Sequence, residues 1–112
     1  MAEKVKIGDI YWFTTKGVIA HPHVIIRIDE NNEFLSVCSI TTNTKKFDMP
    51  GNVILNVGEG NLEAQSIVEV SKEISVSKNQ LKLYIGSLSI EKVNEILDGI
   101  HLVKRSFLTK HS

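Results

Sequence analysis

The sequence predicts a mainly β (α+β) fold: a small, twisted, partly open antiparallel β-barrel of roughly five or six short strands, followed by one C-terminal α-helix. As far as Val76, short runs rich in β-branched and aromatic residues alternate with turn residues. Beyond Ser89 the apolar residues change to helical spacing. The length of 112 residues suits one domain, residues 1–112, with a single core.

The first three strands are expected at 10–13, 24–29 and 34–41. The first is short and aromatic, and the second alternates, with Val24, Ile26 and Ile28 on one face. The turn between the second and third strands, 30–33, contains two asparagines, which accept a positive φ at little cost. A hairpin is therefore predicted between them.

The middle of the chain is expected to add further strands. A connection containing Pro-Gly, 44–51, leads into a strand at 53–57, where alternate residues are apolar. Two short strands are then expected at 66–70 and 74–76, separated by an irregular polar link.

The final helix is predicted from its apolar stripe, which follows the spacing i, i+3, i+4, i+7. The stripe consists of Val93, Ile96, Leu97 and Ile100. Ser89 precedes it as an N-cap, and Glu91 complements the helix dipole. Gly99 is expected either to weaken the last turn slightly or to begin the end of the helix.

The hairpin brings two polar clusters together. Because antiparallel strands joined by a tight turn place the start of one beside the end of the next, 21–23 should neighbour 41–43. These segments read His-Pro-His and Thr-Thr-Asn, and polar side chains at strand ends are frequent sites of binding and catalysis. This end of the hairpin is the predicted functional site.

Composition excludes several other classes of protein. Thirteen basic residues balance thirteen acidic ones, so no overall charge attracts nucleic acid or membrane. Cys38 cannot form an intrachain disulfide, and it lies in an apolar run that predicts a buried thiol. The first residues lack a signal-like apolar region, and no stretch is long enough to cross a bilayer. A cytoplasmic protein is expected.

Five short motifs follow one another along the chain in an order that can be compared with known families. They are Lys-Ile-Gly-Asp-Ile-Tyr-Trp at 6–12, His-Pro-His-Val-Ile-Ile at 21–26, Ser-Ile-Thr-Thr-Asn at 39–43, Gln-Ser-Ile-Val at 65–68 and Ile-Gly-Ser-Leu at 85–88. In this order the chain resembles the MazF/PemK/Kid family of toxin ribonucleases, small SH3-like barrels of bacterial toxin–antitoxin pairs.

The resemblance implies an endoribonuclease that cleaves single-stranded RNA (mRNA) without a metal ion or other cofactor and inhibits growth. It also implies a homodimer and a small antitoxin partner with an acidic, disordered tail. The chain departs from the family in two places. His21 stands before the motif proline in place of the catalytic arginine, and 72–76 lacks the arginine of the corresponding family segment. The alternative is a catalytically silent barrel that binds RNA or a protein partner.

Cleavage by internal attack needs a base, an acid and donors for the charge on phosphorus. Imidazole titrates near neutrality, so His21 is the candidate acid or base, and Thr41 is its partner for a non-bridging oxygen. The candidate RNA contacts are Lys16, His23, Asn43 and Lys45.

These residues also have simpler interpretations. His21 and His23 can serve as polar caps of a strand, and Thr41 can satisfy a backbone group. Two imidazoles at i and i+2 can chelate zinc, although no third ligand has a diagnostic spacing. Lys45 can be an ordinary solvated charge, and the aromatic residues at 11–13 can pack in the core instead of stacking on bases.

A homodimer is further predicted from the third strand, which is apolar on both faces. Leu35 and Val37 lie opposite Phe34, Cys38 and Ile40, and a second copy is expected to cover them.

Overall fold

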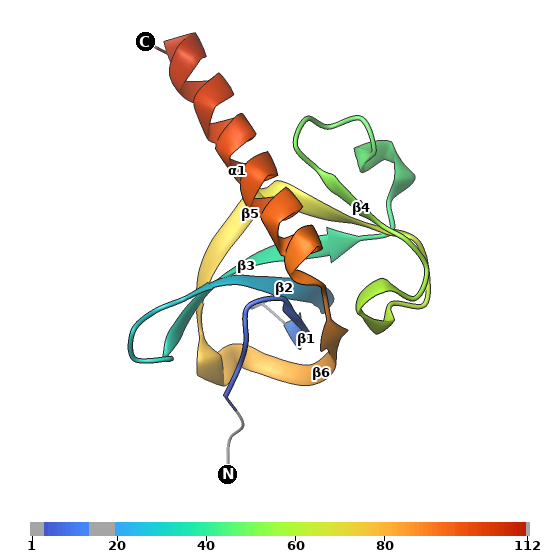
Figure 1. Cartoon of the computed structure of the whole chain (residues 1–112), viewed down its shortest axis with the longest axis vertical. Helices are drawn as coiled ribbons and strands as arrows, with labels where there is room; N and C mark the ends of the chain where they lie inside the picture. Colours follow the sequence, from blue (N-terminus) through green and yellow to red (C-terminus); the bar gives the residue numbers. More distant parts are fainter. Residues whose placement is uncertain (1–3, 14–19, 112) are drawn as a thin grey trace.

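The computed structural model describes residues 4–13 and 20–111, and it consists of one open antiparallel sheet of six strands and one long helix. The order across the sheet is β4-β5-β3-β2-β1-β6 (Figure 1). The strands are β1 (Asp9–Phe13), β2 (His21–Ile28), β3 (Phe34–Thr41), β4 (Val53–Leu55), β5 (Ser66–Ser77) and β6 (Leu81–Ser87). The helix is α1 (Ile90–His111), and the short 3-10 helices are η1 (Thr44–Lys46), η2 (Glu59–Asn61) and η3 (Lys78–Gln80). The predicted mainly β fold with a C-terminal helix is confirmed.

The β2–β3 hairpin forms where the sequence predicts it. The carboxylate of Asp29 accepts hydrogen bonds from the backbone N–H of Glu33 at 2.9 Å and of Phe34 at 3.2 Å. Asn32 adopts the left-handed conformation, with φ of 58°. These local bonds fix the register of β2 against β3.

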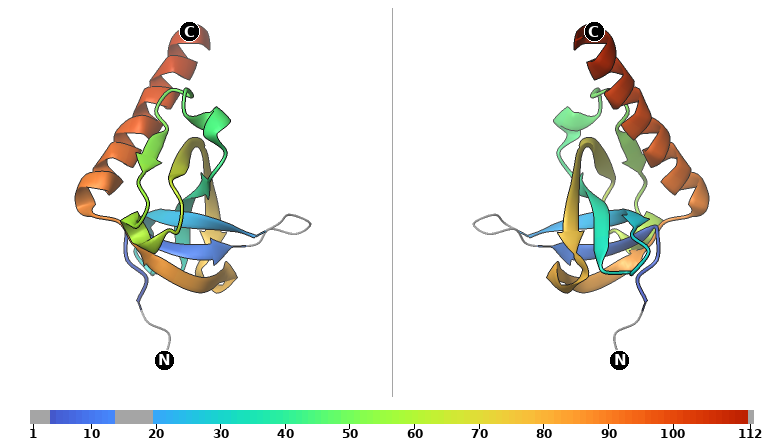
Figure 2. Two further views of the ribbon diagram at one scale, coloured as in Figure 1. Left: turned by 90° about the vertical axis from the view of Figure 1, so that its right-hand side faces the viewer. Right: turned by 90° about the vertical axis from the view of Figure 1, so that its left-hand side faces the viewer.

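Alternation along the strands divides the core in two, so the expectation of a single core is wrong. The helix-side core packs one face of the sheet against α1, and it includes Ile10, Val24, Ile26, Cys38, Ile40, Val68, Val70, Val93, Ile96 and Ile100. The barrel-side core fills the opposite, concave face, and it consists of Val5, Phe13, Ile25, Leu35, Val37 and Val76. The strongly twisted sheet curls around the second of these cores (Figures 1 and 2).

The face of β3 that was expected to bind a second copy is covered within the same chain. Leu35 is 1% exposed and Val37 is fully buried, both inside the barrel-side core of the same chain. Phe34, placed on the buried face by the sequence, is 55% exposed. The curled sheet therefore covers the face that a second copy was expected to cover.

Two strands differ from the sequence prediction. The pieces expected at 66–70 and 74–76 belong to one strand of twelve residues, β5, which bridges β4 and β3. An irregularity in the β3–β5 pairing lies between Cys38 and Ile40, opposite the polar link that suggested an interruption. Strand β6 was not predicted, although its aliphatic residues Leu81, Leu83 and Ile85 alternate along the chain.

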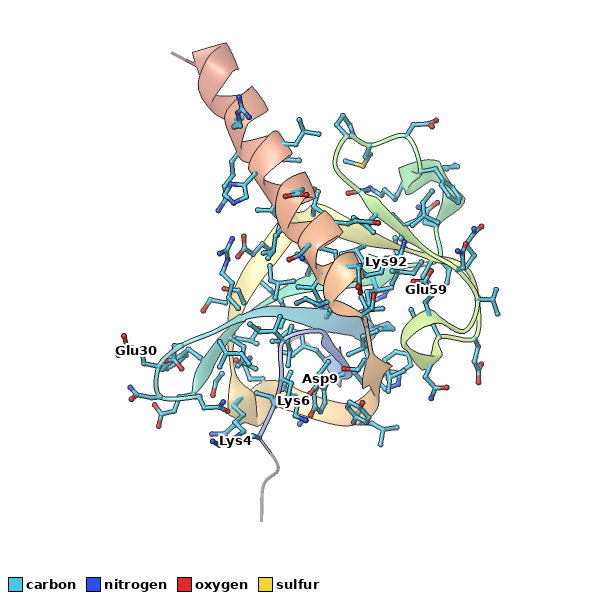
Figure 3. All side chains as sticks on the ribbon, viewed as in Figure 1. Lys4, Lys6, Asp9, Glu30, Glu59 and Lys92 are labelled. Atoms are coloured by element: carbon cyan, nitrogen blue, oxygen red, sulfur yellow. The ribbon has the colours of Figure 1, made fainter. Side chains whose placement is uncertain are left out.

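The helix begins as predicted but extends further. Ser89 Oγ accepts the backbone N–H of Lys92 at 3.2 Å, and Val93, Ile96 and Ile100 are buried. The Lys92 ammonium donates to the Ile54 carbonyl at 3.2 Å. It also lies 4.0 Å from Glu59 (Figure 3), which ties the first turns to β4 and η2.

Gly99 does not end the helix, which continues to His111 and leaves the sheet (Figures 1 and 2). The glycine instead allows a close contact with the loop before β4. A Cβ at Gly99 would lie 2.1 Å from the carbonyl oxygen of Gly51. Glycine is therefore needed at position 99 for this close packing, and it does not terminate the helix.

Cys38 is fully buried in the helix-side core, as predicted. Burial raises the pKa of its thiol to about 12, and the nearby Glu73 carboxylate adds to this effect. Such a thiol is protonated and inert at neutral pH. No described helix has the length and apolarity needed to cross a membrane.

Candidate functional site

The predicted site lies where β2 begins and β3 ends. His21 pairs with Phe13 of β1, and His23 pairs with Ser39 of β3, so the antiparallel register brings His21 to the level of Thr41. His21 is exposed and Thr41 is half-buried. Both line the same two pockets, which meet between them.

The apolar pocket, with a volume of about 580 Å³, opens on the helix-side face of the strand ends. It is lined by Trp12, Ala20, His21, Pro22, Ile40, Thr41, Thr42, Asn61, Leu62, Glu63, Ala64, Ser66, Leu83, Tyr84 and Ile85. Trp12 is 37% exposed and Tyr84 52% exposed, so aromatic surface is available in it.

The histidine pocket, with a volume of about 400 Å³, opens on the barrel side. It is lined by Phe13, His21, His23, Ser39, Ile40, Thr41, Asn43, Lys46, Glu69, Lys72 and Ile74. Alternation explains part of the division, because His23 and Ser39 share the barrel-side face and line only this pocket, whereas Pro22 lies on the other face and lines only the first. The pockets therefore differ in the residues that line them, the first mainly aliphatic and aromatic and the second rich in titratable side chains.

His23 is held rigidly at the floor of the histidine pocket. It is 8% exposed, and its Nδ1–H donates to the carbonyl oxygen of His21 at 2.9 Å. Its ring packs edge-on against Phe13, with ring centres 5.0 Å apart. Burial lowers the pKa of His23, the positive charge of His21 acts in the same direction, and the His21 carbonyl and the Glu69 carboxylate oppose them. The imidazole is therefore neutral at neutral pH.

A buried carboxylate faces this histidine. Glu69 is 5% exposed, and its Oε2 accepts the Ser39 hydroxyl at 2.8 Å. The ammonium of Lys72 lies 3.2 Å from the same oxygen. The charge is thus paired and hydrogen-bonded, as a buried carboxylate requires.

The rim beside Thr41 is a chain of local turns. Thr41 Oγ1 accepts the backbone N–H of Asn43 at 3.1 Å, as the simpler interpretation of Thr41 predicts. Asn43 Oδ1 then accepts the backbone N–H of Lys45 at 3.0 Å. Because Thr41 uses its oxygen as an acceptor, its hydroxyl hydrogen remains a donor for a ligand.

Comparison with known proteins identifies the family of this chain. The profile of the PemK-like, MazF-like toxins of type II toxin–antitoxin systems matches residues 6–103. The chain belongs to this family. The family and the fold predicted from the sequence are therefore both confirmed. No curated protein sequence matches the chain.

The solved structures with the same fold as this PemK/MazF-like chain include two endoribonucleases. One is an endoribonuclease in complex with its cognate antitoxin from a mycobacterial species. It has 19% identity and a TM-score of 0.69 over 83% of this chain and 87% of that chain. The other is an endoribonuclease from a mycobacterial species, with 17% identity and a TM-score of 0.70 over 88% of each chain. At these identities the likeness concerns the fold.

In this PemK/MazF-like fold the structure gathers four of the predicted site residues: His21, Thr41, His23 and Asn43 line the histidine pocket. Lys45 is exposed on the adjacent η1 but lines neither pocket, and Lys16 lies outside the described residues.

Four further polar residues of the pocket were not among the predicted site residues. They are Ser39, Lys46, Glu69 and Lys72. One signal was available, because Glu69 is a single charge inside the apolar run 67–70. Within 4–13 and 20–111, no three His, Cys, Asp or Glu side chains gather as metal ligands would.

Proposed function

We propose that this protein is a cytoplasmic toxin endoribonuclease that cleaves single-stranded RNA, chiefly mRNA, without a metal ion. One observation carries the proposal: two pockets of different chemistry meet at an exposed imidazole and a hydroxyl donor, His21 and Thr41. Family membership supports the toxin class, and both similar structures are endoribonucleases.

The chemistry required by internal attack fits this junction. A base must take the 2′-hydroxyl proton, an acid must protonate the departing 5′-oxygen, and donors must stabilise the charge on phosphorus. His21 can transfer a proton from its position between the pockets, and Thr41 can donate to a non-bridging oxygen. Both groups act directly on RNA, so the reaction needs no Lewis acid at this site.

The two pockets suit different parts of a nucleotide. Trp12 and Tyr84 offer aromatic surface in the apolar pocket, on which an unpaired base can stack. Lys46, Lys72 and Asn43 supply donors in the histidine pocket, where a phosphate can bind. Lys45 and Lys16 remain proposed contacts with the flanking backbone. A base-paired strand cannot place a base in the apolar pocket, so the substrate is single-stranded.

The purified protein is expected to cleave a long single-stranded RNA in the presence of EDTA and to leave the same sequence intact when it is annealed to its complement. Its induction in a bacterial host is expected to arrest growth. The measurement is a gel-based cleavage assay, with matched growth curves. If no RNA is cleaved and growth continues, the protein is instead a silent barrel that binds RNA or a protein, as the absence of both family arginines would then explain.

We also propose a small antitoxin as the protein partner. Support comes from the similar structure that contains an endoribonuclease with its cognate antitoxin. An acidic, disordered tail would neutralise Lys46 and Lys72 at the histidine pocket and exclude RNA from it.

A homodimer is proposed on a different surface from β3. The open sheet leaves β4 and β6 as its edges, and they expose apolar side chains, with Ile54 40% exposed and Leu83 70% exposed. Light scattering at micromolar concentration is expected to give twice the mass of the 12.5 kDa chain. A mass of one chain over the whole concentration range would contradict the dimer.

A further inference from the structure

We propose that His23 is the general base of the cleavage reaction, acting through its Nε2 atom, and that Glu69 positions and stabilises the imidazolium that forms. The inference rests on the proposed function, and it gives His23 a role beyond contacting RNA. His21 then serves as the general acid.

The ring of His23 is held in one orientation. Only a protonated ring nitrogen can donate to a carbonyl, so the 2.9 Å contact with the His21 oxygen assigns the proton to Nδ1. In the neutral ring, Nε2 is then the nitrogen with a free lone pair. The edge-on contact with Phe13 restricts the ring on its other side. A base held in one tautomer and one orientation is prepared for proton transfer.

The Nε2 atom of His23 is also accessible. Among the described residues Nε2 forms no hydrogen bond, and the side-chain hydrogen bond of His23 to the His21 carbonyl uses Nδ1. Only Asn32 Oδ1 is a fully covered side-chain polar atom without a partner in the described ranges. The Nε2 atom is therefore not sealed, and His23 lines the histidine pocket together with His21 and Thr41.

Charged side chains surround the imidazole ring of His23. Glu69 and Lys72 face it from β5, Lys46 from η1 and His21 from its own strand, while Phe13 and Ser39 face it without charge. Glu69 is fixed by Ser39 at 2.8 Å and by Lys72 at 3.2 Å. When His23 takes a proton, this carboxylate is the negative group that stabilises the imidazolium.

Cleavage then proceeds by transfer of two protons, one to His23 and one from His21. The Nε2 lone pair of His23 takes the proton of the 2′-hydroxyl, and the 2′-oxygen forms a bond to phosphorus. The bond from phosphorus to the 5′-oxygen breaks, and the imidazolium of His21 gives its proton to that oxygen. The products are a 2′,3′-cyclic phosphate and a 5′-hydroxyl, with His23 protonated and His21 neutral. Proton exchange with water restores both residues.

The first test is single-turnover cleavage of a single-stranded RNA by wild type, H23A and H23Q, with binding of an uncleavable 2′-deoxy RNA measured in parallel. Both variants are expected to cleave about 10²-fold or more slowly, since this is the usual contribution of a general base. Their affinity for the 2′-deoxy RNA should stay close to that of wild type. The matched control is H101A, which removes an exposed histidine of α1 and should cleave at the wild-type rate.

The second test is the pH dependence of the cleavage rate of wild type and E69Q. It remains informative even where the His23 variants do not fold. The cleavage rate should fall on the acid side as His23 becomes protonated, below the ordinary histidine pKa, because burial lowers the pKa of this group. The Glu69 charge raises that pKa, so E69Q should lower it and move the acid limb to still lower pH. The control is E95Q, which changes an exposed residue of α1 and should leave the dependence of the cleavage rate on pH unchanged.

The outcomes are distinct. A wild type that cleaves while H23A and H23Q cleave equally fast overturns the role of His23 and leaves the proposed function intact. An acid limb that E69Q does not move, or moves to higher pH, overturns the role of Glu69. A wild type that cleaves no RNA overturns the proposed function itself, and His23 with it.

Discussion

Replacing His21 with alanine is expected to lower the rate of RNA cleavage by between about 10² and 10⁴-fold, which raises the barrier by about 3 to 5 kcal/mol. The expectation follows from its place at the junction of the two pockets proposed to bind RNA, where its imidazole is exposed. Because the side chain is exposed, the melting temperature should stay close to that of wild type. Single-turnover cleavage and thermal denaturation of the same preparation measure both effects.

The matched comparison is K45A, whose lysine lies on the adjacent η1 but lines neither pocket. Loss of a phosphate contact should weaken RNA binding and flatten its dependence on salt, with little effect on the single-turnover rate at saturation. A rate for H21A equal to that of wild type would contradict the role of His21. A rate for K45A as low as that of H21A would show that the assay follows binding and not chemistry.

The meeting of His21 and Thr41 could be predicted because it depends on local structure. Two alternating strands and an Asx-type turn at Asp29 determine the hairpin, and the register then follows from residues close in sequence. The buried thiol of Cys38 was predictable for the same reason, since its surroundings are apolar in the sequence itself.

The carboxylate beside His23 could not be predicted in the same way. Glu69 bonds to Ser39 across thirty positions of sequence, and the contact depends on β5 lying beside β3. The sequence divided β5 into two pieces, so it gave no reason to place Glu69 against the hairpin. Similarly, alternation showed that β3 is apolar on both faces, but not that the sheet curls over Leu35 and Val37. Local periodicity predicts which side chains share a face of a strand, but not which other part of the chain packs on that face.

Gly99 shows the same limit at a single residue. Glycine is a poor helix former and often ends helices, so the sequence favoured a helix ending near this position. In the structure the backbone of α1 instead approaches Gly51, which has a φ of 82°, and a side chain at either glycine would meet the backbone of the other segment. The close approach of two segments that are distant in sequence therefore requires glycine at position 99, despite its low helix propensity.

Replacing Gly99 with alanine is accordingly expected to destabilise the protein, although alanine is the better helix former by about 1 kcal/mol. The added Cβ would lie 2.1 Å from the Gly51 carbonyl oxygen and 3.1 Å from Val70 Cγ1, so the helix must shift away from the sheet. Overpacking of this kind costs about 1 to 3 kcal/mol, occasionally more, and here the obstacle is backbone that cannot rotate aside. For a domain of this size, a net loss of 1 kcal/mol lowers the melting temperature by about 4 to 8 °C.

The control is N94A, which places alanine at an exposed position nearer the start of α1. Alanine at that position should raise the free energy of unfolding slightly, because only helix propensity changes. Opposite signs for G99A and N94A in urea denaturation would separate packing from propensity. If G99A proved as stabilising as N94A, the contact between α1 and the Gly51 loop would not hold the helix on the sheet, and the helix-side core would have to rely on Val93, Ile96 and Ile100 alone to position it.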